Sequence, residues 1–105
     1  MNMRRKMPET EYRASRFCRI MGNPTAYQIV RYLTKKRRSS PTELVERIGL
    51  SLQTICDTLR NLRNIDVVRY DTVHKNKVYF LRDRKIVGIL EDIEGFVRRI
   101  RVKDW

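Results

Sequence analysis

The chain has 105 residues, of which 41% are hydrophobic and 34% charged, a length and composition that suit one domain with a modest core. It contains no apolar run long enough to span a membrane and no export signal, so we expect a cytoplasmic protein without membrane contact. The formal net charge of +12 attracts polyanions, which makes nucleic acid the leading partner class.

The N-terminal residues 1–8 are basic and have no periodic apolar pattern, so they are predicted to form a flexible tail that either frays or touches a phosphate backbone. One domain is expected over residues 9–105. Its first helix is predicted from Glu9 to Met21, with Cys18 on the apolar face. We interpret Cys18 as a small buried hydrophobic residue rather than a redox centre.

A second helix is predicted to begin at Asn23 and Pro24, which form an N-cap followed by a first-turn proline. The basic cluster Lys35–Arg38 ends this helix. Cations at a helix C-terminus complement the helix dipole, but four in a row exceed what that effect requires. The cluster is therefore either a solvated basic loop or a loop that touches phosphate.

The stretch Ser40–Ile65 predicts two short helices joined by a tight turn. Ser40 and Glu43 have the spacing of a capping box, Gly49 can end the first helix in a left-handed conformation, and Ser51 can cap the second. The predicted buried face of the second helix consists of Leu52, Ile55, Leu59 and Leu62. This arrangement is a helix-turn-helix, whose second helix enters the major groove of DNA.

Two β-rich segments, Val67–Val73 and Lys77–Leu81, predict a hairpin. They are separated by His74, Lys75 and Asn76, of which Asn76 can accept a positive backbone angle. A basic hairpin after a recognition helix is a wing, and its Lys75 and Lys77 are predicted to contact the minor groove or the backbone. The same charges can also discourage edge-to-edge strand pairing, and both interpretations can hold.

A last helix is predicted to follow Asp83 as its cap, with an apolar stripe wider than the core of so small a domain requires. We therefore expect a homodimer in which this stripe packs, together with the first helix, against a second subunit. The predicted interface residues are Phe17, Met21, Ile89, Ile93, Phe96, Val97 and Ile100.

Several segments, taken in order, resemble the ArsR-type winged-helix transcriptional regulators. The segments are Gly22–Thr25, Thr42–Ser51, Thr54–Ile55, Leu59–Arg63, Val67–Arg69 and Val78–Leu81. The resemblance spans roughly residues 15–97. It implies a mainly α winged helix-turn-helix with about five helices and a two-stranded β-hairpin as the wing, whose first helix contributes to a dimer interface.

By this resemblance, Gln53, Cys56, Asp57 and Arg60 face the groove. Gln53 can read adenine, and Arg60 can bind guanine or a phosphate. Asp57 departs from the basic or imidazole residue common at its position, so it either accepts a hydrogen bond from a cytosine amino group or pairs with Arg60 and aims it. Cys56 is either a simple small side chain or a redox-sensitive thiol. The full predicted DNA-binding set is Ser51, Gln53, Thr54, Cys56, Asp57, Thr58, Arg60, Arg63, Lys75 and Lys77.

The resemblance does not carry over metal sensing, which in the family uses cysteines before the first motif helix or Asp and His residues on the last helix. The segment Ser39–Val45 has no cysteine, and the single histidine is His74 at the wing tip. A zinc site needs four convergent ligands, so we expect no metal and no cofactor. His74 also lacks the neighbours of a catalytic base, so we do not expect an enzyme.

Together these features predict a sequence-specific double-stranded DNA-binding regulator, a repressor acting as a homodimer on an inverted-repeat operator. The alternative is an architectural protein that coats DNA by charge alone, although Gln53 and Asp57 on the groove face argue against it. A third interpretation is a winged helix that contacts protein or RNA.

Overall fold

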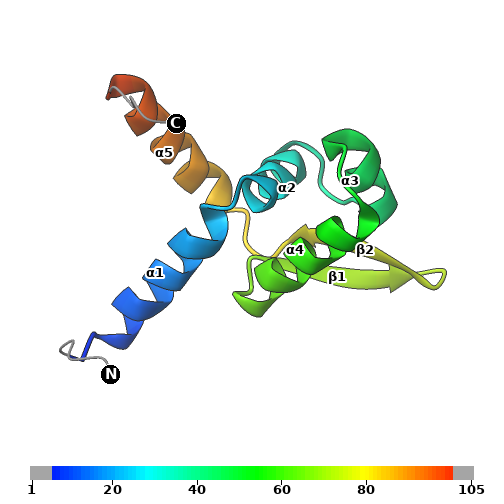
Figure 1. Cartoon of the computed structure of the whole chain (residues 1–105), viewed down its shortest axis with the longest axis horizontal. Helices are drawn as coiled ribbons and strands as arrows, with labels where there is room; N and C mark the ends of the chain where they lie inside the picture. Colours follow the sequence, from blue (N-terminus) through cyan, green and yellow to red (C-terminus); the bar gives the residue numbers. More distant parts are fainter. Residues whose placement is uncertain (1–5, 101–105) are drawn as a thin grey trace.

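The computed structural model describes residues 6–100, so most of the predicted tail and the last five residues of the predicted domain lie outside the described residues. The described elements are α1 (Glu9–Met21), α2 (Pro24–Lys35), α3 (Pro41–Ile48), α4 (Leu52–Asn64), β1 (Val68–Val73), β2 (Asn76–Leu81) and α5 (Ile86–Arg99). Five helices and one antiparallel hairpin confirm the predicted fold class. In Figure 1, α2, α3, α4 and the hairpin form a compact body, from which α1 and α5 diverge on one side.

The core lies between α2, α3, α4 and the base of the hairpin. Its fully buried large side chains are Ile29, Val30, Leu33, Leu44, Ile55, Leu59, Leu62, Val68 and Leu90. Those of α2 and α4 recur at three- and four-residue spacing, which is the pattern of one buried face. Met21 at the end of α1 and Leu90 near the start of α5 join this core, so both projecting helices pack on it through their inner ends.

Helix α5 is also joined to α2 by a polar cluster. The hydroxyl of Tyr27 donates a hydrogen bond of 2.6 Å to Glu94, and the same carboxylate forms an ion pair of 3.1 Å with Arg31. Burial, followed by the hydrogen bond to Glu94, raises the pKa of Tyr27 to about 12. The cluster fixes the direction in which α5 leaves the body.

The predicted caps of α3 are confirmed in part. Ser40 Oγ accepts a hydrogen bond from the Glu43 amide at 3.1 Å, and Gly49 ends the helix with φ of +87°. The other half of the capping box is not formed, because the Glu43 carboxylate turns away to Tyr32 on α2 and to Lys36 directly after it. Glu43 therefore joins two helices instead of capping one.

The wing differs from the prediction at its turn. Val73 pairs with Asn76, and the two residues between them, His74 and Lys75, have φ of 50° and 68°. Two positive φ angles define the two-residue turn whose twist matches that of the flanking strands. Asn76, predicted to lie between the strands and to be able to accept a positive angle, is already the first residue of β2, so placing it in the loop was wrong.

The start of α5 was also predicted wrongly. Asp83 does not cap the helix, which begins at Ile86; its carboxylate accepts a hydrogen bond from the Lys85 amide at 2.9 Å and closes a turn before the helix. Arg84 in that turn donates to the carbonyls of Leu33 and Thr34 at the end of α2. The turn therefore serves to cap α2.

Cys18 is exposed in the single chain, because α1 leaves the body and reaches the core only through its C-terminal part, with Phe17, Ile20 and Met21. Its predicted burial therefore depends on the predicted dimer and stays a prediction. Cys56 is half-buried, and neither cysteine is in a disulfide.

Candidate nucleic-acid interface

Helix α4 presents one side to solvent along its whole length. Ser51 caps it by accepting a hydrogen bond from the Thr54 amide at 3.1 Å, and the Ser51 hydroxyl lies 3.0 Å from that of Thr54. The buried side is formed by Ile55, Thr58, Leu59 and Leu62. The opposite side is free to enter a groove, as expected of the second helix of a helix-turn-helix.

Two residues of α4 differ in exposure from the prediction, since Thr58 is buried and Leu52 is exposed. Thr58 is only 8% exposed, and its hydroxyl donates to the Thr54 carbonyl at 2.8 Å, so its predicted role in DNA binding was wrong. Leu52, predicted to be buried, is 52% exposed because it occupies the first turn, beyond the edge of the core. Helical spacing explains Thr58, which lies one turn from Ile55 and Leu62.

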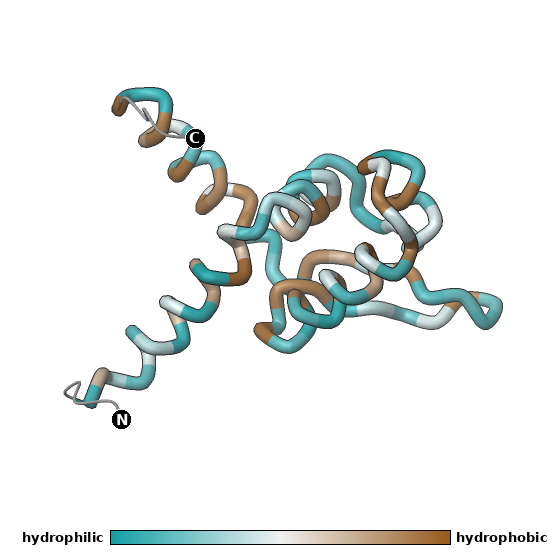
Figure 2. The backbone as a smooth tube through the Cα atoms, viewed as in Figure 1, coloured by the Kyte–Doolittle hydropathy of each residue, from teal (hydrophilic) through white to brown (hydrophobic). Residues whose placement is uncertain are grey.

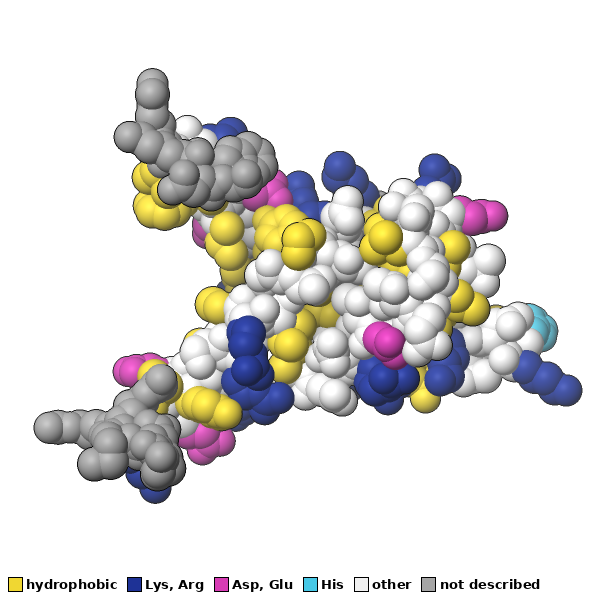
Figure 3. Space-filling view, in the orientation of Figure 1, with side chains coloured by type: hydrophobic (Ala, Val, Ile, Leu, Met, Phe, Trp, Pro, Cys, Tyr) yellow, Lys and Arg dark blue, Asp and Glu magenta, His cyan; other side chains and the backbone are white. Residues whose placement is uncertain are grey.

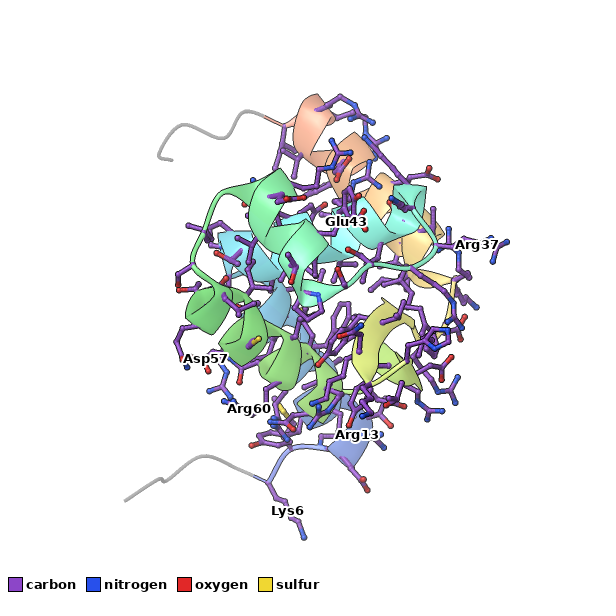
Figure 4. All side chains as sticks on the ribbon, turned by 90° about the vertical axis from the view of Figure 1, so that its right-hand side faces the viewer. Lys6, Arg13, Arg37, Glu43, Asp57 and Arg60 are labelled. Atoms are coloured by element: carbon purple, nitrogen blue, oxygen red, sulfur yellow. The ribbon has the colours of Figure 1, made fainter. Side chains whose placement is uncertain are left out.

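The exposed side of α4 carries a connected polar stripe. Gln53 Nε2 donates to both carboxylate oxygens of Asp57, at 3.1 and 3.2 Å, and an Arg60 guanidinium nitrogen lies 3.2 Å from Asp57 Oδ1. In Figure 4 the Asp57 and Arg60 side chains lie side by side and point away from α4. The predicted pairing of Asp57 with Arg60 is thus formed, and Gln53 joins it as a third member.

A hollow of about 740 Å³ separates the N-terminal half of α4 from the wing. Leu52 and Cys56 line it from α4, Thr42 from α3, and Val73 and Lys77 from the hairpin. Cys56 therefore faces the wing rather than the tip of the exposed stripe. The hollow is open, so a ligand that lies across both elements has access to it.

The wing places its cations around one aromatic side chain. Lys77 Nζ lies 4.8 Å from the ring centre of Tyr70, and the guanidinium of Arg63 from α4 lies 5.3 Å from the same ring. Tyr70 in turn packs against Tyr79 at 5.3 Å between centroids. Cations next to an aromatic face are held by its quadrupole, so Arg63 and Lys77 are positioned together. Lys75 lies on the turn at the wing tip.

The junction of α4 and the wing is fixed by charge. Asp66 has φ of +60°, and its carboxylate pairs with Arg69 at 3.1 Å and Arg82 at 3.4 Å. The hydrogen bond from Arg69 holds the pKa of Asp66 below its usual value, so the carboxylate keeps its charge further into acid than a free aspartate does.

The residues of the basic cluster Lys35–Arg38 have different partners in the structure. Lys36 pairs with Glu43, while Arg38 pairs with Asp71 of β1 at 2.8 Å and lies 5.0 Å from the ring centre of Phe80. Arg37 points outward in Figure 4. The sequence did not indicate that Arg38 supports the wing, because its partners lie more than thirty residues away. Figure 3 shows other Lys and Arg side chains over α4 and at the wing tip.

The predicted dimer residues fall into two groups. Large apolar side chains stay exposed along α5, where Figure 2 shows hydrophobic residues continuing beyond the body and Figure 3 shows them on the surface. This group consists of Ile89, Ile93, Phe96, Val97 and Ile100, which are 40–53% exposed. In contrast, Met21 is 6% exposed and belongs to the core of the subunit, and Phe17 is half-buried against that core. Met21 is therefore not available on the surface as predicted.

No group of three or more His, Cys, Asp or Glu side chains within residues 6–100 is arranged to hold a metal ion. In the same part of the chain, no helix has the length and apolar character needed to cross a membrane.

Comparison with known proteins agrees with this architecture. Residues 23–69, from the cap of α2 into β1, match the family described as winged helix-turn-helix DNA-binding. A comparison with curated proteins found no match.

Solved structures share the fold over most of the chain. HlyU from Vibrio cholerae N16961 is 22% identical with a TM-score of 0.75, covering 87% of this chain and 98% of its own. NolR from Sinorhizobium fredii is 22% identical with a TM-score of 0.76, and the match covers 90% of this chain and 97% of NolR. The transcriptional repressor PagR of Bacillus anthracis is 19% identical with a TM-score of 0.70, and the match covers 80% of this chain and 95% of PagR. The chain thus has the winged helix-turn-helix fold, as its ArsR-type resemblance predicted, and its residues 23–69 match the winged helix-turn-helix DNA-binding family.

Proposed function

We propose that the protein is a sequence-specific transcriptional regulator that binds double-stranded DNA as a homodimer and represses by occluding a promoter. The observation that carries this proposal is the exposed stripe Gln53–Asp57–Arg60 on the second helix of a helix-turn-helix, beside a wing that carries Lys75 and Lys77. A similar solved structure is named as a transcriptional repressor, which supports the same direction of regulation.

The DNA contacts follow from the positions of these groups. The stripe on α4 meets base edges in the major groove, while Lys75, Lys77 and Ser51 contact the backbone on either side. Backbone contacts of this kind release counterions, so affinity falls as salt rises. The net charge of +12 adds long-range attraction and raises the rate of association.

The dimer rests on the apolar stripe of α5. Ile93 and Phe96 are 43% and 53% exposed at the middle of the stripe, and Tyr12 on α1 is 53% exposed. A set of large apolar side chains on one helix face is typical of a protein interface, and a second copy of the chain offers the same face for a two-fold symmetric contact. A dimer of this kind places two copies of α4 about 34 Å apart, in successive major grooves.

Selection of random duplexes by the purified protein at physiological salt, followed by sequencing, tests the proposal. We expect an enriched inverted repeat, and light scattering should give the mass of a dimer. Arg60→Ala should erase discrimination between the enriched site and random DNA, whereas Arg19→Ala on α1, with the same loss of charge, should retain it. Tight binding without enrichment would instead indicate an architectural protein, and no binding would remove DNA as the partner.

Ile93→Glu tests the dimer separately. A charge in the middle of an apolar interface is not compensated, so the variant should be monomeric and bind the inverted repeat far more weakly. Glu91→Gln lies on the opposite side of α5 and should remain dimeric. A monomeric wild-type protein would contradict the assignment of the α5 stripe to a second copy.

A further inference from the structure

Asp57 is the shared acceptor of the stripe on α4. It lies four residues after Gln53 and three before Arg60, so all three side chains occupy one side of the helix. Both carboxylate oxygens accept from Gln53 Nε2, and Oδ1 also accepts from Arg60. An ionised carboxylate has no donor, so the Gln53 amide must turn its nitrogen toward Asp57.

This arrangement neutralises the charge of Arg60 at the place where the helix meets DNA. The pair is exposed, with 60% of the Arg60 side chain and 46% of the Asp57 side chain accessible. Exposed pairs of this kind contribute little to stability, so the contact opens readily when a better set of partners arrives. On DNA the available partners are a backbone phosphate and the edge of a base pair.

A backbone phosphate cannot replace the contact between Asp57 and Arg60. Its oxygens accept hydrogen bonds from Arg60, but it has no donor for Asp57 and repels the negative charge of that carboxylate. A G·C base pair, in contrast, presents in the major groove the O6 and N7 acceptors of guanine and the N4 amino donor of cytosine. One such pair can therefore satisfy Arg60 and Asp57 together, whereas the backbone satisfies only one of them.

We propose that Asp57 is a specificity-determining residue, whose pair with Arg60 is exchanged for a G·C base pair and which disfavours binding of α4 to the phosphate backbone. The inference rests on the proposed function, and it adds to that function the class of base pair that is read and the means by which random DNA is rejected. Gln53 is the positioning residue, because it holds the Asp57 carboxylate from the N-terminal side.

The test compares Asp57→Asn with wild type on the enriched duplex, on that duplex with each G·C pair changed to A·T, and on random DNA, over a range of salt. Without the acid, Arg60 can contact phosphate. Affinity for random DNA should rise about fivefold at physiological salt, and the slope of log affinity against log salt should steepen by about 0.9. Discrimination at one G·C pair per half-site should fall about tenfold.

Glu91→Gln provides the matched control, since it removes one negative charge from an exposed position on α5 and should change neither quantity beyond a small uniform gain. Equal affinities of Asp57→Asn and wild type for random DNA, or unchanged discrimination at every G·C pair, would overturn the inference. So would an equal loss on all duplexes, which would indicate a purely structural role. Failure of the wild-type protein to select any duplex would overturn the proposed function itself, and that result is visible before the variant is measured.

Discussion

Ser39 and Tyr79 are joined by two backbone hydrogen bonds, from the Ser39 amide to the Tyr79 carbonyl at 3.0 Å and from the Tyr79 amide to the Ser39 carbonyl at 2.8 Å. The bridge adds a single residue of a third strand to the wing, immediately before α3. Both side chains are buried. The position of the wing relative to the helix-turn-helix is therefore set by this contact as well as by the chain connection after α4.

Ser39→Pro should test that bridge, because proline has no amide hydrogen and leaves the buried carbonyl of Tyr79 without its partner. We expect a loss of about 1–3 kcal/mol in the free energy of unfolding, together with weaker binding to all duplexes. Denaturant unfolding and duplex titration measure the two effects. Ser39→Ala keeps the amide and loses only the hydroxyl contact to the Ser40 carbonyl, so its effect should be smaller. Equal losses of unfolding free energy in Ser39→Pro and Ser39→Ala would mean that the loss of the hydroxyl contact, and not of the backbone bridge, causes the destabilisation.

Gly49→Ala should destabilise the turn between α3 and α4. The glycine has φ of +87°, and a Cβ there would meet nothing within 4 Å, so the cost comes from the backbone conformation alone. We expect a loss of about 1–2 kcal/mol in urea unfolding. Gly88→Ala is the matched change in the first turn of α5, at an ordinary helical φ where the added Cβ also has space, and it should stabilise by up to about 0.5–1 kcal/mol. A stabilising effect at Gly49 would contradict the assigned turn.

Glu43→Gln should lower the melting temperature at neutral pH. The hydrogen bond from Lys36, and after it that from Tyr32, lowers the pKa of Glu43 below the usual 4.5. A lowered pKa means that the stabilisation is present above the unfolded-state value and is lost as pH falls through the folded-state value. The difference between wild type and variant should therefore shrink as the pH drops below 4.5. Glu46→Gln, exposed on the same helix, is the control, and a difference that grows in acid would contradict the assigned ion pair.

The helices could be predicted from the sequence because their signals are local. Asn23, Ser40 and Ser51 each cap the helix that follows, with hydrogen bonds to an amide three residues later. The apolar spacing of α4 also identified its exposed side correctly, except at Leu52 and Thr58. Thr58 lies at helical spacing from Ile55 and Leu62, so its burial follows from the same pattern. Leu52 lies in the first turn, beyond the edge of the core, where the packing of neighbouring elements decides exposure.

The contacts that position the wing could not be predicted, because each joins residues distant in sequence. Arg38 reaches Asp71, and Arg84 reaches the carbonyl of Leu33. The positive φ angles of His74 and Lys75 were missed for a different reason. Neither residue type marks such a turn as glycine would, and the register of the two strands determines which residues occupy it.

Changing Lys75 and Lys77 together to glutamine should weaken binding to every duplex by a similar factor. Both lysines are exposed on the wing, so they are expected to neutralise phosphates and to read no base. Loss of two phosphate contacts reduces the slope of log affinity against log salt by about 1.8 and lowers affinity about thirtyfold at physiological salt. The control is a double variant with Arg98 and Arg99, at the end of α5, changed to glutamine. It removes the same charge from another part of the molecule, so it should have a much smaller effect on affinity. Because phosphates are identical in all sequences, a loss confined to the enriched site would assign the wing lysines to base recognition instead.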